Sequence, residues 1–135
     1  MTLPRSLISA GFFSWLDSAL SQPIPARTEA FHFNLYEGAD SVHVQLVGTE
    51  AFLPGANPST DYWPSAETFS TGEDIFEVPF TVAGPDWRAW LKTLIDLVNS
   101  YIADGSKSGI LRSRMGVGIG FVDGDMHVLW HRDAA

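Results

Sequence analysis

Two spacings of apolar residues divide the chain into predicted helices and strands. Over residues 5–21 the apolar side chains recur every three or four positions, which is typical of an amphipathic helix. These positions are Leu7, Ile8, Phe12, Trp15, Leu16, Ala19 and Leu20. Pro23 ends this helix. A second stripe with the same spacing follows Pro85, placed at the first helical position, and stops at Gly105, so the pattern predicts two helices.

Alternation of apolar and polar residues follows the first helix. It predicts strands over residues 31–36 and 42–47, joined by a four-residue hairpin loop over 37–40. Pairing Leu35 with Val42 collects the apolar side chains on one face of this hairpin. The opposite face is polar and carries His32, Asn34, His43 and Gln45.

The middle of the chain is patterned less regularly. Residues 53–72 are interrupted by proline and glycine, show no period and are expected to form a long loop. A strand over about residues 74–80 follows the loop. Pro79 favours an edge position for this strand, because proline cannot donate a ladder hydrogen bond.

The stretch MGVGIGFVDGDMHVLWH, residues 115–131, predicts a closing hairpin that turns at residues 123–124. Alternation gives this hairpin one apolar face and places a row of glycines beside two histidines on the other. This glycine track and its neighbours are Gly116, Gly118, Gly120, His127 and His131. Because bare strand positions accept a close approach, either the first helix lies on the track or the track is an open groove for a partner.

The glycine track does not match a known ligand motif. No helix N-terminus and no Lys-Ser or Lys-Thr pair follows the glycines, which argues against a phosphate-binding loop. His127 and His131 lie about 13 Å apart along a strand, too far to share a metal ion. The stretch is therefore interpreted as a hairpin whose glycines are covered by a neighbour.

In chain order the predicted elements are α-β-β-loop-β-α-β-β, which indicates an α+β fold. We expect an antiparallel β-sheet of about five strands packed by two helices, in a single domain over residues 1–135. The chain has no cysteine, which excludes a disulfide framework and thiol catalysis. The first helix carries Asp17 among its apolar residues, so we interpret it as amphipathic rather than as a signal peptide. No apolar run is long enough to cross a bilayer, and we expect a cytoplasmic protein.

Charge is distributed unevenly along the chain, whose net charge is −8. Residues 28–87 contain ten Asp and Glu and no Lys or Arg, whereas the segments on either side are close to neutral. Such a field repels nucleic acids and anionic membranes and attracts basic proteins. We therefore expect a basic protein partner, and neither nucleic-acid nor membrane binding. The alternative is that the acids serve only solubility.

The strongest candidate for a binding surface is the segment TDYWPSAETFSTGED, residues 60–74. Tyr62 and Trp63 are aromatic residues of the type that anchor protein interfaces. The acids around them are Asp61, Glu67, Glu73 and Asp74. These acids would steer a basic partner and raise the rate of association. The alternative is that Trp63 packs in the core and the acids are only solvated.

No motif in the chain predicts catalysis. A G-x-S-x-G nucleophile motif is absent, and we assign no catalytic residue, cofactor or metal ligand. The chemical alternative is a small metal-dependent hydrolase that uses His32 and His43, which the predicted pairing places near each other across the first hairpin. We expect a binding protein rather than an enzyme.

The final stretch VGIGFVDGDMHVLWHR, together with the small, acidic, cysteine-free chain, resembles the immunity proteins of bacterial polymorphic toxin systems. The resemblance implies a protein that neutralises a cognate toxin, often a basic nuclease, by direct binding. The element order is also similar to class I type III secretion chaperones, which are small acidic dimers, although the predicted elements end with a strand where those chaperones have a helix. A homodimer formed through the glycine track or the Pro79 strand is a further alternative.

Overall fold

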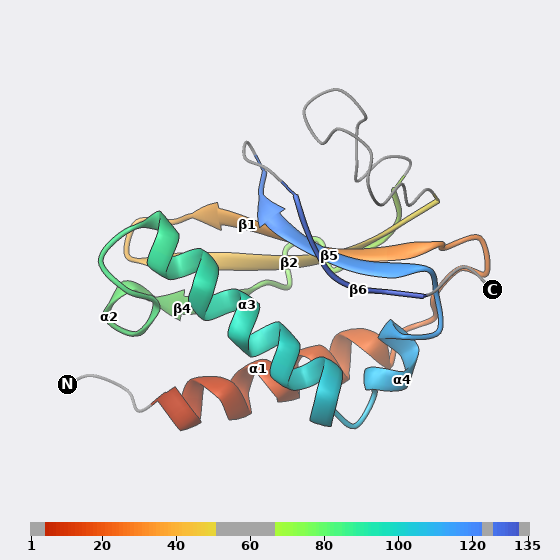
Figure 1. Ribbon diagram of the computed structural model, residues 1–135, viewed down its shortest axis with the longest axis horizontal. Coiled ribbons are helices and arrows are strands. Elements are labelled where there is room, and N and C mark those ends of the chain that lie inside the picture. Colours follow the sequence, from red (N-terminus) through yellow and green to blue (C-terminus); the bar gives the residue numbers. More distant parts are fainter. Residues whose placement is uncertain (1–4, 51–66, 123–125, 133–135) are drawn as a thin grey trace.

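A computed structural model of the protein describes residues 5–50, 67–122 and 126–132. A six-stranded, mostly antiparallel open sheet is packed on one face by helices (Figure 1). Within these residues the elements are α1 (Arg5–Leu20), β1 (Ala30–Glu37), β2 (Ser41–Thr49), β3 (Glu67–Ser70), β4 (Phe76–Pro79), α2 (Phe80–Ala83), α3 (Trp87–Asp104), α4 (Ser108–Leu111), β5 (Gly116–Phe121) and β6 (His127–His131). The predicted α+β class is confirmed, with one more strand and two more helices than expected.

The elements that the sequence pattern missed are all short. β3, α2 and α4 have four residues each, and β3 lies in the stretch expected to be a loop. Four residues give too few repeats of either period to be recognised. Phe80, expected to continue the strand of Phe76 and Val78, instead begins α2 directly after Pro79.

One pair of strands departs from the expected antiparallel pattern. The strand order is β3-β2-β1-β5-β6, and β4 pairs with the same side of β2 as β3 does. β1 and β5 are parallel, whereas the other pairs are antiparallel. The chain reaches β5 through α2, α3 and α4, which is the long crossover that parallel neighbours need. The expectation of a wholly antiparallel sheet is wrong for this pair. The sequence pattern of a hairpin shows how its own two strands pair, but it does not show which earlier strand the hairpin joins.

The first hairpin has the predicted faces but a different register. Leu35 pairs with Val44 rather than with Val42, and β1 continues to Glu37, which pairs with Val42. The connecting turn is therefore three residues, 38–40, instead of four. A shift of two residues keeps every side chain on its predicted face, because the side-chain period of a strand is two.

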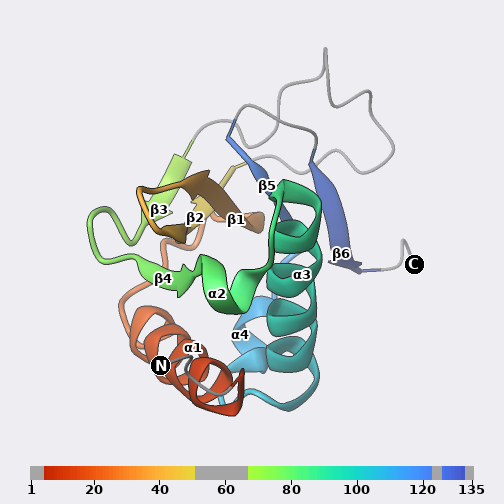
Figure 2. The same cartoon turned by 90° about the vertical axis from the view of Figure 1, so that its left-hand side faces the viewer.

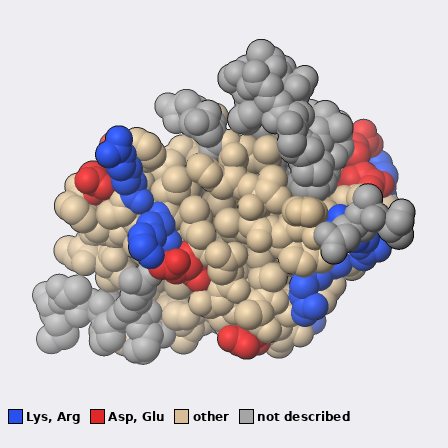
Figure 3. Space-filling model, in the orientation of Figure 1, with Lys and Arg blue, Asp and Glu red and all other residues tan. Residues whose placement is uncertain are grey.

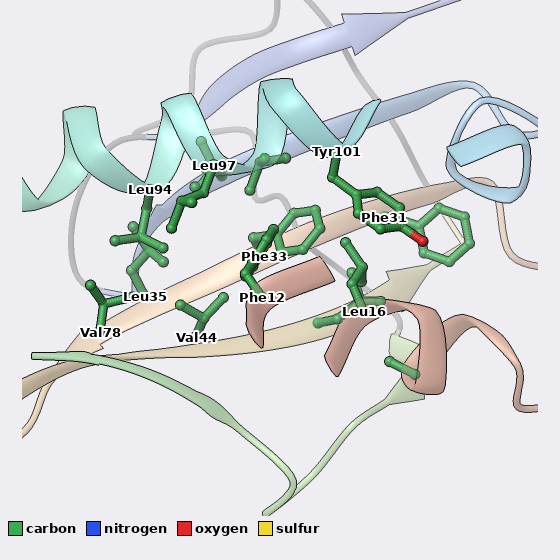
Figure 4. Close-up of a cluster of buried hydrophobic side chains, with 14 of the residues drawn as sticks. Phe12, Leu16, Phe31, Phe33, Leu35, Val44, Val78, Leu94, Leu97 and Tyr101 are labelled. Carbon is green, nitrogen blue, oxygen red and sulfur yellow. The ribbon is translucent and has the colours of Figure 1, made fainter. Parts of the chain in front are cut away.

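The core lies between the sheet and the helices that cover one of its faces (Figure 2). Phe12 of α1 lies against Phe33 of β1, with ring centroids 6.2 Å apart. Leu35 and Leu94 are fully buried in the same cluster (Figure 4). Burying a side chain of this kind contributes roughly 1.5–3 kcal/mol. The opposite face of the sheet carries the polar residues of β1 and β2, as the alternation predicted.

α3 is the longest helix and has a defined beginning and end. Asp86 is its N-cap residue, and its carboxylate accepts a hydrogen bond from the Ala89 N–H at 3.0 Å. Pro85 therefore precedes the cap instead of occupying the first helical position as expected. At the other end a Cβ on Gly105 would lie 2.6 Å from the Tyr101 ring, so only glycine fits. No helix in the described ranges has both the length and the apolar character of a membrane span.

Candidate functional site

One edge of the sheet carries a row of exposed carboxylates. β3 and β4 lie end to end along β2 there, with a turn over residues 71–75 between them. We call this the acidic edge and define it by Glu67 of β3, Glu73 and Asp74 of the turn, and Glu77 of β4, all of which are exposed. The structure thus places the three described acids selected from the sequence on one edge and adds Glu77.

Three further residues predicted to bind a partner belong to this region of the chain, and one acid on the edge was not predicted. Asp61, Tyr62 and Trp63 lie outside the described residues, and their role stays a prediction. Glu77 was overlooked, although it alternates with apolar neighbours in the strand predicted over 74–80. That alternation was the signal for its outward position.

Thr71 joins the two halves of the acidic edge to β2. Its backbone N–H donates to Leu46 O at 3.0 Å, and its Oγ1 accepts from the Leu46 N–H at 3.2 Å. Thr71 is buried, so water competes little for these bonds. The acidic edge is therefore hydrogen-bonded to β2 across the gap between β3 and β4.

The turn that presents Glu73 and Asp74 is held from two sides. Gly72 has a φ of 59°, a conformation that favours glycine. From the sheet, Gln45 Nε2 donates to Gly72 O at 3.0 Å. From α1, Trp15 Nε1 donates to Asp74 O at 3.2 Å. These side chains fix the backbone of the turn while both carboxylates stay exposed.

Glu77 links the acidic edge to the polar face of the sheet. Its Oε1 accepts a hydrogen bond from Ser41 Oγ at 2.9 Å and lies 3.0 Å from His43 Nε2. Protonation of His43 turns the second contact into an ion pair. The ring of His43 meets Tyr36 edge-on, with centroids 5.4 Å apart. Since Glu77 already contacts these groups, the other three carboxylates are the better candidates for contact with a partner.

A hydrogen-bonded path crosses the polar face from the centre of the sheet to the acidic edge. Asn34 Nδ2 of β1 donates to Gln45 Oε1 of β2 at 3.2 Å, and Gln45 in turn donates to Gly72 O. The turn of the acidic edge is thereby tied to β1. Asn34 and Gln45, predicted only as members of a polar face, are supporting residues for the carboxylates.

His32 lies on the same polar face but is buried, with 3% of the residue exposed. Burial lowers the pKa of His32 to about 4, because desolvation disfavours the imidazolium form. His32 is therefore neutral at physiological pH. It adds no positive charge that would offset the acidic edge.

The strand pairing separates the two histidines of the hydrolase hypothesis. His32 pairs with Val47 and His43 pairs with Tyr36, so the two imidazoles are four residues apart along the face, or about 13 Å. The expectation that they are close neighbours is wrong, because it rested on the register that pairs Leu35 with Val42. Among the described residues, no group of three or more His, Asp or Glu could hold a metal ion.

The glycine track lies on the face of the sheet away from the helices. β5 pairs with β1 so that Gly118 lies beside His32 and Gly120 beside Asn34, while Ile119 belongs to the core on the other side. The expectation that the first helix packs on the track is wrong, because α1 covers the opposite face. The open groove for a partner stays a prediction. Sequence reasoning missed these neighbours because they depend on the parallel pairing.

A bulge in the second hairpin separates His127 from His131. His131 pairs with Gly116 as predicted, but the register then shifts, and His127 pairs with Ile119 instead of Gly120. Residues that pair directly share a face. His131 therefore lies on the side of the glycine track, whereas His127 lies on the side of the helices, and the expected pair of imidazoles beside the track is wrong for His127. The predicted turn at 123–124 lies outside the described residues.

No protein-family model, curated protein or solved structure matches the chain. The acidic edge and the polar face behind it are the features of the fold that bear on function. Exposed carboxylates on a hydrogen-bonded frame suit the binding of cationic groups.

Proposed function

We propose that the chain is a non-enzymatic binding module of the inhibitor or immunity type, whose acidic edge binds a basic protein. The observation that carries the proposal is the acidic edge itself. Its carboxylates are exposed, and they belong to a stretch of the chain, residues 28–87, that contains no Lys or Arg. A cationic partner would meet no competing cation from this stretch.

The frame behind the carboxylates supports recognition of a defined partner. Thr71 ties the edge to β2, and Gln45 and Trp15 hold the turn that carries Glu73 and Asp74. A surface that is fixed before association loses less conformational entropy when it binds. The acidic edge is thus a better candidate for specific binding than the same number of acids on unanchored backbone.

The charge distribution supports rapid capture of a basic protein. A net charge of −8 attracts such a partner over long range, and the concentration of acids within one stretch orients the approach. Charges on the surface are screened over about 8 Å at physiological ionic strength. Association through the acidic edge should therefore weaken strongly with added salt.

A binding protein that works as a dimer, as secretion chaperones do, is the second candidate. It shares the acidic surface and differs in that one partner is bound by two copies of the chain together, whereas the acidic edge of a single copy suffices for the first candidate. The observation that favours it is the uncharged outer strand β6, whose sequence contains no Asp, Glu, Lys or Arg.

Charge reversal at the acidic edge tests the proposal. The triple variant Glu67→Lys, Glu73→Lys, Asp74→Lys moves the net charge from −8 to −2, since each reversal adds two units. A control variant with the same net charge carries Asp96→Lys, Asn99→Lys, Ser100→Lys and Asp104→Lys, all at exposed positions of α3 and away from the acidic edge. Each protein is immobilised and exposed to a lysate of the cells that produce the chain, and bound proteins are identified by mass spectrometry.

We expect the wild-type and control chains to retain the same basic protein, which salt elutes, and the acidic-edge variant to lose it. Circular dichroism verifies that all three chains are folded. Retention of that partner by the acidic-edge variant contradicts the proposal. So does equal loss in the control, since total charge rather than the acidic edge would then explain binding.

A further inference from the structure

The strand β6 closes the sheet on the side away from the acidic edge (Figure 2). One side of β6 pairs with β5, and no other described strand pairs with its outer side. Along the outer side of a terminal strand, backbone N–H and C=O groups point away from the sheet and are able to pair with another strand. We call this outer side the β6 edge.

The β6 edge lacks the acidic residues, Lys, Arg and proline that often protect an edge strand. Residues 126–131 have the sequence MHVLWH and contain no Asp, Glu, Lys, Arg or Pro. Charged residues, proline and bulges are among the means by which an edge strand is kept from pairing with another chain. The β6 edge has only the last of these, a bulge at Leu129, which has no pairing partner on β5 and twists the strand locally.

The side chains along the β6 edge are apolar as well as uncharged. Val128, Leu129 and Trp130 are each partly exposed, and Leu129 and Trp130 also pack against the core. Figure 3 looks onto this side of the molecule and shows no Lys, Arg, Asp or Glu side chain at its centre. The surface therefore fits a strand of the same apolar, uncharged character.

We propose that β6 pairs with β6 of a second copy of the chain in antiparallel orientation, so that one sheet runs through a two-fold symmetric dimer. Such an interface uses the same surface on both copies. Leu129 lies at the middle of β6 and therefore near the two-fold axis, while His127 and His131 lie at the two ends of the paired strands. The acidic edge takes no part in this interface, so the dimer does not depend on the proposed function.

The distribution of charge favours a second copy as the occupant of the β6 edge. Two molecules of net charge −8 repel each other, and the repulsion is smallest when their acids are farthest apart. β6 lies four strand positions from β3, or about 19 Å. Residues 88–135, which include β6, carry six Lys and Arg against five Asp and Glu. Pairing through β6 therefore leaves the two acidic edges at the far ends of the dimer.

Sedimentation velocity at a series of protein concentrations tests the dimer. We expect the wild-type protein to sediment with twice the chain mass of 14.8 kDa. The variant His127→Lys with His131→Lys places like charges at both exposed ends of the paired strands, and it should weaken the dimer about tenfold. The control Asn99→Lys with Ser100→Lys adds the same charge at exposed positions of α3 and should dimerise like the wild type.

Three outcomes of this measurement overturn the proposal. The first is a wild-type monomer at every concentration. The second is a dimer of equal stability in the His127→Lys, His131→Lys variant, which would place the interface elsewhere. The third is equal weakening in the α3 control, which would show that added charge alone disrupts association.

Single cysteines test the orientation of the strands, because the chain has none of its own. Leu129→Cys lies near the proposed two-fold axis and should form an intermolecular disulfide on mild oxidation. Glu73→Cys, on the acidic edge, should remain a free thiol at the same protein concentration. Equal crosslinking of both variants, or no crosslinking of Leu129→Cys, overturns the proposed pairing.

Discussion

The two outer edges of the sheet are built in opposite ways. The acidic edge consists of two strands of four residues each, interrupted by a turn, with Pro79 at its end and exposed carboxylates along it. The β6 edge is one strand of five residues without a charged residue or proline. Short strands, proline and charge all oppose strand pairing. Of these two edges, β6 is the better suited to extending the sheet, although it carries a bulge.

This difference separates two kinds of recognition on one fold. At the acidic edge side-chain charges dominate, and salt screens their attraction to a basic protein. At the β6 edge backbone hydrogen bonds and apolar side chains contribute most to association. Salt does not weaken these interactions as it weakens the attraction between charges. β1 lies between the two edges and supports both. Substitutions can therefore be sorted by whether they affect both edges or one.

The largest effect is expected from Phe33→Ala in β1, which removes a fully buried ring that contacts Phe12. We expect the free energy of unfolding to fall by about 4 kcal/mol. Because β1 supports both edges, spectroscopic probes placed on β4 and on β6 should report one common transition in urea. Phe13→Ala, at a partly exposed position of α1, is the control and should cost less. Separate transitions at the two edges would show that they are not joined through β1.

A smaller effect on both edges is expected from pH, through His32 in β1. The pKa of His32 is about 4 in the folded chain against 6.5 for an ordinary histidine, so between these values the unfolded chain binds the extra proton. Above pH 6.5 His32 does not lower the free energy of unfolding. As the pH falls below 6.5 the unfolded chain takes up the proton first, and the free energy of unfolding decreases by about 3 kcal/mol in total.

Urea denaturation at several pH values between 4 and 6.5 measures the contribution of His32. His32→Leu should flatten the fall in stability across this range, whereas His127→Gln, at an exposed position, should leave it unchanged. An unchanged pH dependence in His32→Leu would mean that another group titrates in the fold.

The smallest effect is expected from Thr71→Val, which keeps the shape of the side chain and removes the acceptor for the Leu46 N–H. Leaving this buried N–H without its bond should cost about 1–2 kcal/mol. The change should speed amide exchange in the acidic edge and weaken partner binding, while dimerisation through β6 stays unchanged. Thr81→Val, at an exposed position of α2, is the matched control. Equal loosening of β6 would contradict the independence of the two edges.

Elements defined by local pattern were predictable from the sequence. The first helix was expected over residues 5–21 and spans Arg5–Leu20, because its apolar stripe is continuous. The edge position of β4 followed from Pro79, whose missing N–H restricts where a strand can lie. In each case the residues that decide the structure are neighbours in the chain.

Pairing between distant segments could not be predicted. The parallel contact of β1 with β5 sets His32 beside Gly118, and no local pattern marks it. The two-residue shift of the first hairpin was hidden because both registers give the same faces. The errors about the neighbours of the histidines follow from these pairings or from the bulge in β6, whereas the first helix was placed on the wrong face of the final hairpin.

The residues of the candidate site also fall into two groups, those that the sequence predicted and those that it did not. The exposed acids Glu67, Glu73 and Asp74 were selected from the charge pattern, which is visible in the sequence. The residues that hold them, Thr71 and Gln45, were not, because their partners are backbone groups brought near by folding. The charged residues of the site can thus be found from the sequence, whereas the hydrogen bonds that hold them in place are visible only in the tertiary structure.

The mass of the complex between the chain and its captured partner, measured by light scattering at low and high salt, tests the account most directly. At about 0.05 M salt we expect the partner to be bound to a dimer of the chain, and at about 0.5 M the partner should leave while the dimer remains, because screening acts on the acidic edge. The species at high salt should then have twice the chain mass of 14.8 kDa. A single chain at high salt, or a partner that stays bound, would contradict the assignment of different roles to the two edges.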